Sequence, residues 1–183
     1  MQKNGQLRYY NGKNMIKIRK ANKNDVKRIR EIYSYYVLNT AITFDYDIPD
    51  VNYFMESIEK INNEFTYLVL EKDNKIIGYS YAVMYKPRLA YKHSVEVTIY
   101  LDINEKGNGY GKMLYNELEK ELKQKGVTNL YAAIGYPIIN DKYLDKNSVN
   151  FHSHLGYKEV GHLNKCGYKF DTFYDLVWME KII

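Results

Sequence analysis

The sequence predicts a mixed α/β fold built from about seven strands and about four helices. Two observations carry this prediction. Residues 94–101 alternate apolar and polar side chains, which is the period of a strand, and leucines then recur every fourth residue from Leu114 to Leu122, which is the spacing of one helix face. A further apolar run, residues 129–134, follows that helix. Strand, helix and strand in this order predict a right-handed parallel crossover.

The N-terminal third predicts a leader, one strand and two helices. Residues 1–14 are polar and contain two glycines and three asparagines, so we expect a flexible leader before a single domain over residues 15–183. Residues 16–19 alternate as a short strand. Two amphipathic helices follow, the first expected to be capped by Asn24 and the second by Asp50. Their inward faces are predicted to consist of Val26, Ile29, Tyr33 and Tyr36 in the first helix and of Val51, Phe54, Ile58 and Ile61 in the second.

The remaining elements are strands and one short helix. Residues 65–71 and 75–85 predict a hairpin around the Asp73-Asn74 turn. After the crossover, residues 135–146 follow neither period and predict an irregular loop. The chain is then expected to close with a helix over residues 148–155, capped by Asn147 or Asp145, and with strands over residues 157–166 and 173–180.

Composition excludes several classes of protein. The 183 residues carry 27 Lys and Arg against 22 Asp and Glu, a net charge of +5 that is spread along the chain, which favours a small polyanionic ligand over nucleic acid. No apolar run approaches the roughly 18 residues of a membrane helix, so we expect no membrane partner. The single cysteine, Cys166, excludes an internal disulfide and suits the cytoplasm. No His, Cys and carboxylate spacing indicates a metal site.

A glycine-rich segment, Lys106-Gly-Asn-Gly-Tyr-Gly-Lys112, separates the strand at 94–101 from the helix that follows. Glycine lets backbone N–H groups approach a ligand, and a helix N-terminus carries partial positive charge, so the pair forms a cradle for an anion, usually phosphate. The spacing G-x-G-x-G fits neither the dinucleotide pattern G-x-G-x-x-G nor the phosphate loop G-x-x-x-x-G-K-[ST]. By itself the segment is equally compatible with a turn that binds nothing.

The segment fits the pattern R/Q-x-x-G-x-G/A and therefore resembles the pyrophosphate loop of the GCN5-related N-acetyltransferase (GNAT) superfamily, with Lys106 in place of Arg or Gln. The order of elements resembles that superfamily as well. Its fold implies a central mixed, mostly antiparallel sheet. The resemblance covers about residues 15–180 and narrows to the phosphinothricin acetyltransferase branch at residues 40–45, 88–96, 147–157 and 165–169 and at Asp175.

The resemblance implies an enzyme that transfers acetyl from acetyl-CoA to an amine by direct attack. An amine is protonated near neutral pH, so a base must remove its proton. Glu96 is the candidate, because a carboxylate inside a covered sheet is desolvated and its pKa rises. A glutamate that faces solvent or pairs with lysine is the alternative.

His152 is the second catalytic candidate. Many relatives carry a tyrosine at this helix position, near the sulfur of CoA, and the branch that this chain resembles has histidine there. Histidine titrates near neutral pH and could act as an acid or as a proton relay to Glu96. A histidine that only packs in the core is the alternative.

Binding of acetyl-CoA is assigned by the same resemblance. A backbone N–H of Val97 or Thr98 would stabilise the oxyanion, the pantetheine arm would lie between the two parallel strands, and the glycine-rich segment would hold the diphosphate. The residues implied are Val97, Thr98, Ile99, Lys106, Gly107, Asn108, Gly109, Tyr110, Gly111, Lys112, Asn147 and Ser148.

The acceptor site carried over from the resemblance consists of Phe44, Arg88 and Tyr91. Arg88 could bind a carboxylate through two parallel hydrogen bonds, which suits an amino-acid-like acceptor. An exposed loop arginine and two ordinary core or lid aromatics are the alternatives. The loop 135–146 looks longer than in relatives, and Asp145 stands where the branch usually has Asn. The acceptor therefore stays open among methionine sulfone- or sulfoximine-like amino acids, other amines and a protein N-terminus.

The leading hypothesis is thus an acetyl-CoA-dependent N-acetyltransferase for a small amine, possibly as a homodimer. A non-catalytic acyl-CoA-binding or regulatory module on the same fold is the alternative. A dinucleotide enzyme is disfavoured by the glycine spacing and by the single parallel crossover.

Overall fold

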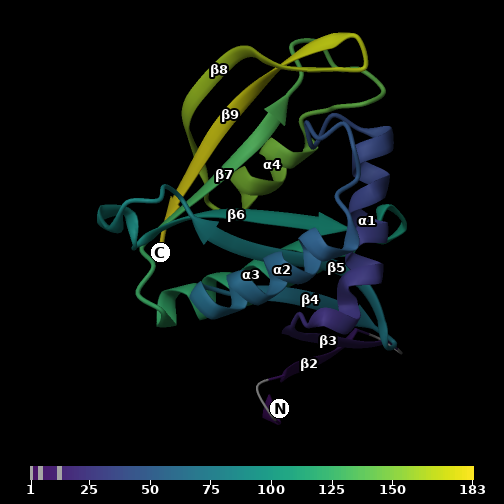
Figure 1. Ribbon diagram of the computed structural model, residues 1–183, viewed down its shortest axis with the longest axis vertical. Helices are drawn as coiled ribbons and strands as arrows, with labels where there is room; N and C mark the ends of the chain where they lie inside the picture. Colours follow the sequence, from purple (N-terminus) through teal and green to yellow (C-terminus); the bar gives the residue numbers. More distant parts are fainter. Residues whose placement is uncertain (1, 4–5, 12–13) are drawn as a thin grey trace. The chain divides into compact units, whose positions relative to one another are not determined.

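The computed structural model describes residues 2–3, 6–11 and 14–183 (Figure 1). The chain divides into two compact units. Unit 1 comprises Met1–Ile32, Pro49–Val83 and Val97–Gly126, and unit 2 comprises Tyr33–Ile48, Met84–Glu96 and Val127–Ile183. Four α-helices are found in the described residues, as predicted, and the seven predicted strands are β3 to β9. Two further strands, β1 and β2, precede them.

Unit 1 contains a run of antiparallel strands, each paired with the next. The strands are β1 (Gln2–Lys3), β2 (Gln6–Asn11), β3 (Asn14–Lys20), β4 (Tyr67–Lys72) and β5 (Lys75–Met84). The predicted hairpin is confirmed, because β4 and β5 pair around Asp73 and Asn74, which both have positive φ, 49° and 67°.

The structure describes two strands within the expected leader. Residues 2–3 and 6–11 are strand, and β2 pairs with β3 from Leu7–Ile18 to Asn11–Asn14. Backbone pairing at a sheet edge needs no apolar side chains, so a polar composition does not indicate these strands. Residues 1, 4–5 and 12–13 of the predicted leader lie outside the described residues.

Helix α1 (Val26–Asn39) follows a short 3₁₀ turn, η1 (Lys23–Asp25). Asn22, not Asn24, caps this segment, because the Asn22 side chain accepts a hydrogen bond from the Asn24 N–H while Asp25 accepts one from the Asn22 N–H. This reciprocal capping box corrects the predicted cap by two residues. Helix α1 continues from unit 1 into unit 2 at Tyr33.

Helix α2 (Val51–Glu64) begins at the predicted cap, where the Asp50 carboxylate accepts a hydrogen bond from the Tyr53 N–H at 2.8 Å. The inward face contains Phe54, Ile58 and Ile61, which are buried. Val51 was predicted on that face but is 48% exposed, because it precedes the packed stripe by one turn.

Helix α3 (Tyr110–Gln124) packs against β4 in unit 1. The predicted leucine face is confirmed, since Leu114, Leu118 and Leu122 are fully buried. Burial of each leucine side chain contributes roughly 1.5–3 kcal/mol. The helix therefore owes its stability to this face, and its N-terminus lies at the end of the glycine-rich segment.

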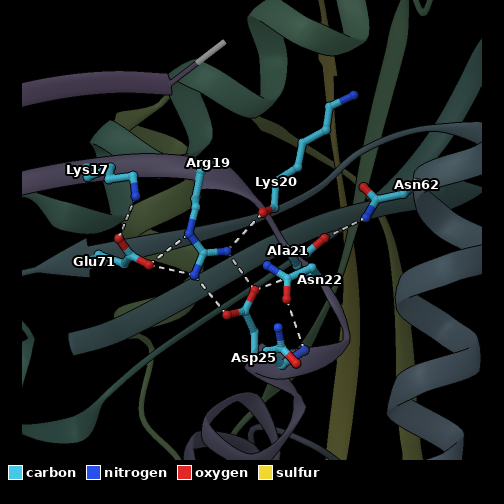
Figure 2. A network of polar contacts seen from close by, with 9 residues as sticks. Lys17, Arg19, Lys20, Ala21, Asn22, Asp25, Asn62 and Glu71 are labelled. Carbon is cyan, nitrogen blue, oxygen red and sulfur yellow. Dashed lines mark hydrogen bonds and ion pairs between the residues drawn. The ribbon is translucent and has the colours of Figure 1, made fainter. Parts of the chain in front are cut away.

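An ionic network ties β3 to the start of α1 and to β4 (Figure 2). The Arg19 guanidinium donates to both oxygens of Asp25, at 2.7 and 2.8 Å, and its Nε donates to Glu71 at 2.8 Å. Lys17 lies 3.3 Å from the second oxygen of Glu71. Asp25 and Glu71 are both buried, so the guanidinium compensates two carboxylates that have left water.

Unit 2 is built on a four-strand arrangement that starts with β6 (Ser94–Leu101). Residues Ser94–Glu96 pair in parallel with Asn129–Tyr131 of β7 (Asn129–Tyr136), which confirms the predicted parallel crossover. Strand β7 pairs with β9 (Thr172–Ile182), and β9 pairs with β8 (Lys158–Lys169), both antiparallel. Strand β7 runs two residues past its predicted end, so the predicted loop 135–146 begins at Pro137.

Helix α4 (Asn147–His154) packs against β7. The helix begins one residue earlier than predicted. Of the two predicted caps, Asp145 supplies the side-chain bond, accepting from the Asn147 N–H at 2.9 Å, and Asn147 is the first helical residue.

The two faces of the unit 2 strands differ in exposure. Residues that pair directly across strands point to the same face, so the register assigns each side chain to one of two sides. One face is buried and carries Leu130, Ala132, Ile134, Val177 and Met179. The other is partly exposed near its middle and carries Glu96, Tyr131, Ala133, Leu176, Trp178 and Glu180. We call this second side the open face.

Candidate active site

Glu96 lies on the open face of unit 2, in register with Tyr131 of β7. Its side chain is partly buried, and desolvation raises the pKa of its carboxyl group, while the positive charge of Lys86 opposes that rise. The carboxylate forms no hydrogen bond or ion pair within 4 Å with another described residue. A desolvated carboxylate without a fixed partner is suited to take a proton from a ligand.

An aromatic cluster stands beside Glu96 on the open face. Tyr85 stacks on Tyr131 with ring centroids 4.4 Å apart, and it contacts Trp178 and Tyr91 edge-on at 5.6 and 6.0 Å. The Tyr131 hydroxyl donates to Glu180 at 2.7 Å, and burial raises the pKa of Tyr131 to about 12. Tyr91 was predicted at the acceptor site. The sequence prediction missed the other three aromatic residues, which come from three separate strands or loops.

Arg88 lies in the segment that leads into Glu96, immediately before the 3₁₀ turn η2 (Leu89–Tyr91). Its backbone carbonyl accepts from the Tyr91 N–H at 2.9 Å, which fixes the turn. The side chain is exposed, and its guanidinium makes no hydrogen bond or ion pair with any residue that the structure describes. All five donors therefore stay available for an anionic ligand.

Phe44 lies farther along the same face. Its ring packs against Tyr174 of β9, with centroids 6.4 Å apart, and it contacts a core formed by Ala41, Leu144 and Tyr174. Gly135 of β7 is next to the ring, and Gly135 is four residues beyond Tyr131 on the same strand. Four residues of strand span about 13 Å, so Glu96 and Phe44 mark two ends of the open face.

His152 is 4% exposed and lies on α4. Its Nδ1 is 2.7 Å from the Ser148 carbonyl oxygen, and because a carbonyl only accepts, Nδ1 carries the proton. Burial lowers the pKa of His152 to about 4, so the imidazole is neutral at pH 7. The neighbouring Asn147 side chain donates to Asp145 at 2.6 Å, and this bond orients the first turn of α4.

The glycine-rich segment belongs to unit 1. Gly107 and Gly109 have φ of 81° and 77°, a conformation that favours glycine. A Cβ on either would meet no heavy atom within 4 Å, so this backbone faces open space. Gly109 precedes α3 without a side-chain cap, and the first-turn N–H groups are left for another acceptor.

Charges around the segment suit an anion. Lys72 pairs with Glu105 at 2.9 Å and thereby neutralises the carboxylate that precedes the loop. Tyr110 is buried, and Lys72 lies 5.9 Å from the centre of its ring. Asn108 donates to the carbonyls of Glu105 and Lys106 at 3.4 and 3.3 Å. The loop is therefore held by its own side chains, and its glycine backbone stays accessible.

The predicted site residues divide between the two units. Unit 2 holds the predicted catalytic and acceptor residues together with Asn147 and Ser148, whereas unit 1 holds Val97, Thr98, Ile99 and the segment Lys106–Lys112. In β6 the division falls between Glu96 and Val97. The recorded parallel pairing also stops at Glu96 and Tyr131, although β6 and β7 run on to Leu101 and Tyr136.

No group of three or more His, Cys, Asp or Glu side chains among the described residues lies close enough to hold a metal ion. No helix within the described ranges is both long enough and apolar enough to cross a bilayer. Cys166, on β8, is a free and exposed thiol.

The chain is similar to known proteins over most of its length. A family model described as an acetyltransferase (GNAT) domain matches residues 18–178. The phosphinothricin N-acetyltransferase of Streptomyces viridochromogenes is 28% identical over 166 residues, covering 91% of this chain and 87% of the relative. An L-methionine sulfoximine/L-methionine sulfone acetyltransferase of Salmonella typhimurium is 25% identical over 166 residues, covering 89% and 92% of the two chains.

A solved structure shows the same architecture. The crystal structure of a GNAT superfamily phosphinothricin acetyltransferase from Sinorhizobium meliloti, in complex with acetyl-CoA, superposes with a TM-score of 0.82 at 28% identity. The match covers 91% of this chain and 87% of that one. The resemblance inferred from the glycine-rich segment and the order of elements is thereby confirmed.

Proposed function

Since the chain belongs to the acetyltransferase (GNAT) family, we propose that it transfers the acetyl group of acetyl-CoA to the amino group of an amino-acid analogue. The observation that carries this proposal is the partly buried Glu96, whose carboxylate has a raised pKa and no fixed partner, on an open face that also holds aromatic side chains. Residues 15–183 form the catalytic domain in this proposal.

Glu96 acts as the general base. The acceptor arrives as an ammonium ion, and Glu96 accepts one of its protons so that the nitrogen lone pair can attack the thioester carbon. The C–N bond forms, the C–S bond breaks, and CoA leaves as the thiolate. Desolvation raises the pKa of the Glu96 carboxyl group, which makes its carboxylate a stronger base.

The glycine-rich segment fits the diphosphate of acetyl-CoA. Left-handed glycines, an uncapped helix start and the neutralised Glu105 together present backbone N–H groups and little negative charge. Residues Lys106–Lys112 would bind the diphosphate, and backbone groups of Val97, Thr98 and Ile99 would bind the pantetheine arm. One N–H of Val97 or Thr98 would stabilise the oxyanion. Acetyl-CoA supplies the activated thioester.

His152 is assigned a positioning role. A neutral imidazole that donates from Nδ1 to Ser148 has a lone pair at Nε2, so it is not a proton donor to the departing thiolate in this state. Its hydrogen bond holds the first turn of α4, where Asn147 and Ser148 would contact acetyl-CoA. The sequence analysis considered His152 as an acid, and we propose a positioning role in place of that one.

The acceptor class follows from the unpaired guanidinium of Arg88 and from the names of the relatives. Relatives are named for phosphinothricin, methionine sulfoximine and methionine sulfone, all amino acids with a carboxylate next to the amine. Arg88 could bind that carboxylate through two parallel hydrogen bonds. Tyr91 and Phe44 would contact the side chain of the acceptor.

The decisive test is Glu96→Gln, which keeps the shape and removes the base. We expect kcat with L-methionine sulfone or phosphinothricin to fall about 10²- to 10⁴-fold, measured as release of free CoA thiol. The Kd for acetyl-CoA, measured by calorimetry, is expected to stay unchanged. Glu117→Gln, at a carboxylate paired with Lys120 on α3, is the matched control.

A wild-type protein that binds acetyl-CoA but acetylates no member of an amino-acid panel would instead favour the non-catalytic binding module. Unchanged turnover in Glu96→Gln would remove Glu96 from the mechanism. These two outcomes are separate, because the first concerns the reaction and the second concerns one residue.

Location and assembly complete the proposal. The free, exposed Cys166 is compatible with a reducing cytoplasm. Exposed aromatic side chains on the last two strands, Tyr168 and Phe173, are candidates for a homodimer contact. Light scattering at several concentrations gives the oligomeric state directly.

A further inference from the structure

We propose that Gly167 and Lys169 of β8 hold the Phe44 ring in place, and that this seat sets which acceptor side chains the enzyme accepts. Both act as positioning residues, since they work through Phe44. The inference rests on the proposed function, in which Phe44 contacts the acceptor. In the sequence both residues lie in the segment 165–169, which carries part of the family resemblance, but neither was given a role.

The ring of Phe44 rests on strands that lack side chains beneath it. A Cβ built on Gly167 would come within 3.0 Å of three ring atoms, closer than real Cβ atoms approach. A Cβ on Gly135 would lie 3.6 Å from the ring and 3.0 Å from the Ala41 carbonyl oxygen. Tyr174, the register partner of Gly167, stacks beside the ring. Glycine at 167 thus makes room for an aromatic ring on the sheet.

Lys169 holds the loop that carries this ring. The side chain is 3% exposed, and its ammonium donates to the carbonyl oxygens of Thr40 and Thr43, each at 2.9 Å. The Lys169 ammonium therefore links two backbone carbonyls of the loop, that of Thr40 and that of Thr43, the residue directly before Phe44. Desolvation lowers the pKa of Lys169, opposed by the charge of Asp45, as expected for a cation that trades water for backbone oxygens.

Other contacts fix the two ends of the same loop, so the seat is part of a defined structure. The Ala41 N–H donates to the Tyr143 carbonyl at 3.0 Å, and Tyr33 bonds Asp45 at 2.6 Å. The Tyr46 hydroxyl donates to the Tyr168 carbonyl, between Gly167 and Lys169. Since residues 40–50 form no helix or strand, the position of Phe44 depends on these contacts. Among these contacts, Gly167 lies against the ring itself, and Lys169 binds the carbonyl of Thr43, the residue directly before Phe44.

The first test is Gly167→Ala against Gly161→Ala. Both glycines lie on β8, but a Cβ at Gly161 would meet Trp178 at 3.8 Å, an ordinary contact. We expect Gly167→Ala to raise the KM for L-methionine sulfone about tenfold. The ratio of this KM to the KM for phosphinothricin is expected to change as well. The KM for acetyl-CoA is expected to stay within twofold. Gly161→Ala is expected to change none of these values. Equal effects of the two substitutions would overturn the proposal.

A double-mutant cycle separates the seat from a general loss of structure. If Gly167→Ala acts through the ring, adding it to Phe44→Ala changes the acceptor KM by less than twofold. Additive effects would overturn the proposal. Phe44→Ala alone tests the proposed function: an unchanged acceptor KM in that single variant removes Phe44 from the acceptor site. A changed KM with an ineffective Gly167→Ala overturns the seat alone.

Lys169 is tested by Lys169→Met and Lys169→Arg. Lys169→Met keeps the length of the side chain but leaves two buried carbonyls without a donor, so hydrogen exchange of residues 40–46 is expected to quicken and the acceptor KM to rise. Lys169→Arg restores the donors. Its acceptor KM is expected to lie, on a logarithmic scale, at least halfway back from the Lys169→Met value to the wild-type value. Should Lys169→Met not fold, Lys169→Gln, which keeps a donor amide but removes the charge, takes its place in the same measurements. Faster exchange with unchanged acceptor kinetics, or no recovery of the acceptor KM in Lys169→Arg, overturns this role.

Discussion

The two units use charge in different ways. In unit 1 lysine and arginine side chains are paired with carboxylates, as in the Arg19, Asp25 and Glu71 network of Figure 2 and in the pairs Arg28–Asp102 and Lys72–Glu105. In unit 2 the buried cation of Lys169 binds backbone carbonyls, and Arg88 and Glu96 have no ion-pair partner among the described residues.

The difference separates charges that hold the fold from charges available to a ligand. Arg19 is enclosed by two carboxylates, and its pKa is raised, chiefly by its hydrogen bond to Asp25. Arg88 has the same side chain on an exposed turn. The same contrast distinguishes Glu71, which binds Arg19 and Lys17, from Glu96. Residue type alone therefore says little about function, whereas the presence or absence of an internal partner says much.

Arg19→Met gives the largest expected effect on stability. Removal of the guanidinium leaves Asp25 and Glu71 partly or fully unpaired in a buried place, which costs about 3–5 kcal/mol of unfolding free energy. Chemical denaturation measures this loss. The activity per folded molecule is expected to stay unchanged. A free energy of unfolding within about 1 kcal/mol of wild type would contradict the expected stabilisation by this ionic network.

His152 is expected to make unit 2 sensitive to acid. Burial lowers its pKa from 6.5 to about 4, so the folded state favours the neutral imidazole and resists its protonation. This contribution, up to about 3 kcal/mol, is present above pH 6.5 and is lost as the pH falls toward 4. His152→Asn retains a donor for Ser148 and is expected to flatten the pH dependence of denaturation over that window. An equally steep dependence in His152→Asn would contradict this expectation.

Arg88→Gln is expected to affect binding of the acceptor and nothing else. Loss of a charged hydrogen-bonding pair costs about 1.5–3 kcal/mol, so the acceptor KM should rise about 10- to 100-fold. The acetyl-CoA KM and the melting temperature are expected to stay unchanged, because Arg88 makes no internal ion pair. Lys92→Gln, at an exposed residue on the same loop, is the control. A loss of stability in Arg88→Gln would show that Arg88, like Arg19, stabilises the fold, and would contradict this prediction.

Lys86→Gln gives the smallest effect. Lys86 opposes the raised pKa of Glu96, so its removal lets that pKa rise further. The acidic limb of kcat/KM, which reports protonation of the base, should move to higher pH. The sign follows because a base with a higher pKa is protonated sooner as the pH falls. A shift to lower pH would contradict Glu96 as the titrating group.

Much of the fold could be predicted because its signals are local. Leu114, Leu118 and Leu122 mark one helix face, and Asp73-Asn74 supplies the two positive φ values of a tight hairpin. Errors occurred where a local signal competed with another. Asn22 and Asn24 are both good caps, and the reciprocal bond from Asp25 decided between them. The first strands were missed because edge pairing leaves a weak apolar pattern.

The sequence by itself determined the family, the glycine-rich segment and the candidate base, since each depends on short motifs or on the order of elements along the chain. Tertiary structure decided which of these residues have partners. Tyr85, Tyr131 and Trp178 meet only through the pairing of distant strands, and Gly167 receives Phe44 from a loop more than a hundred residues earlier. Strand register depends on packing of whole faces, which no short stretch of sequence encodes.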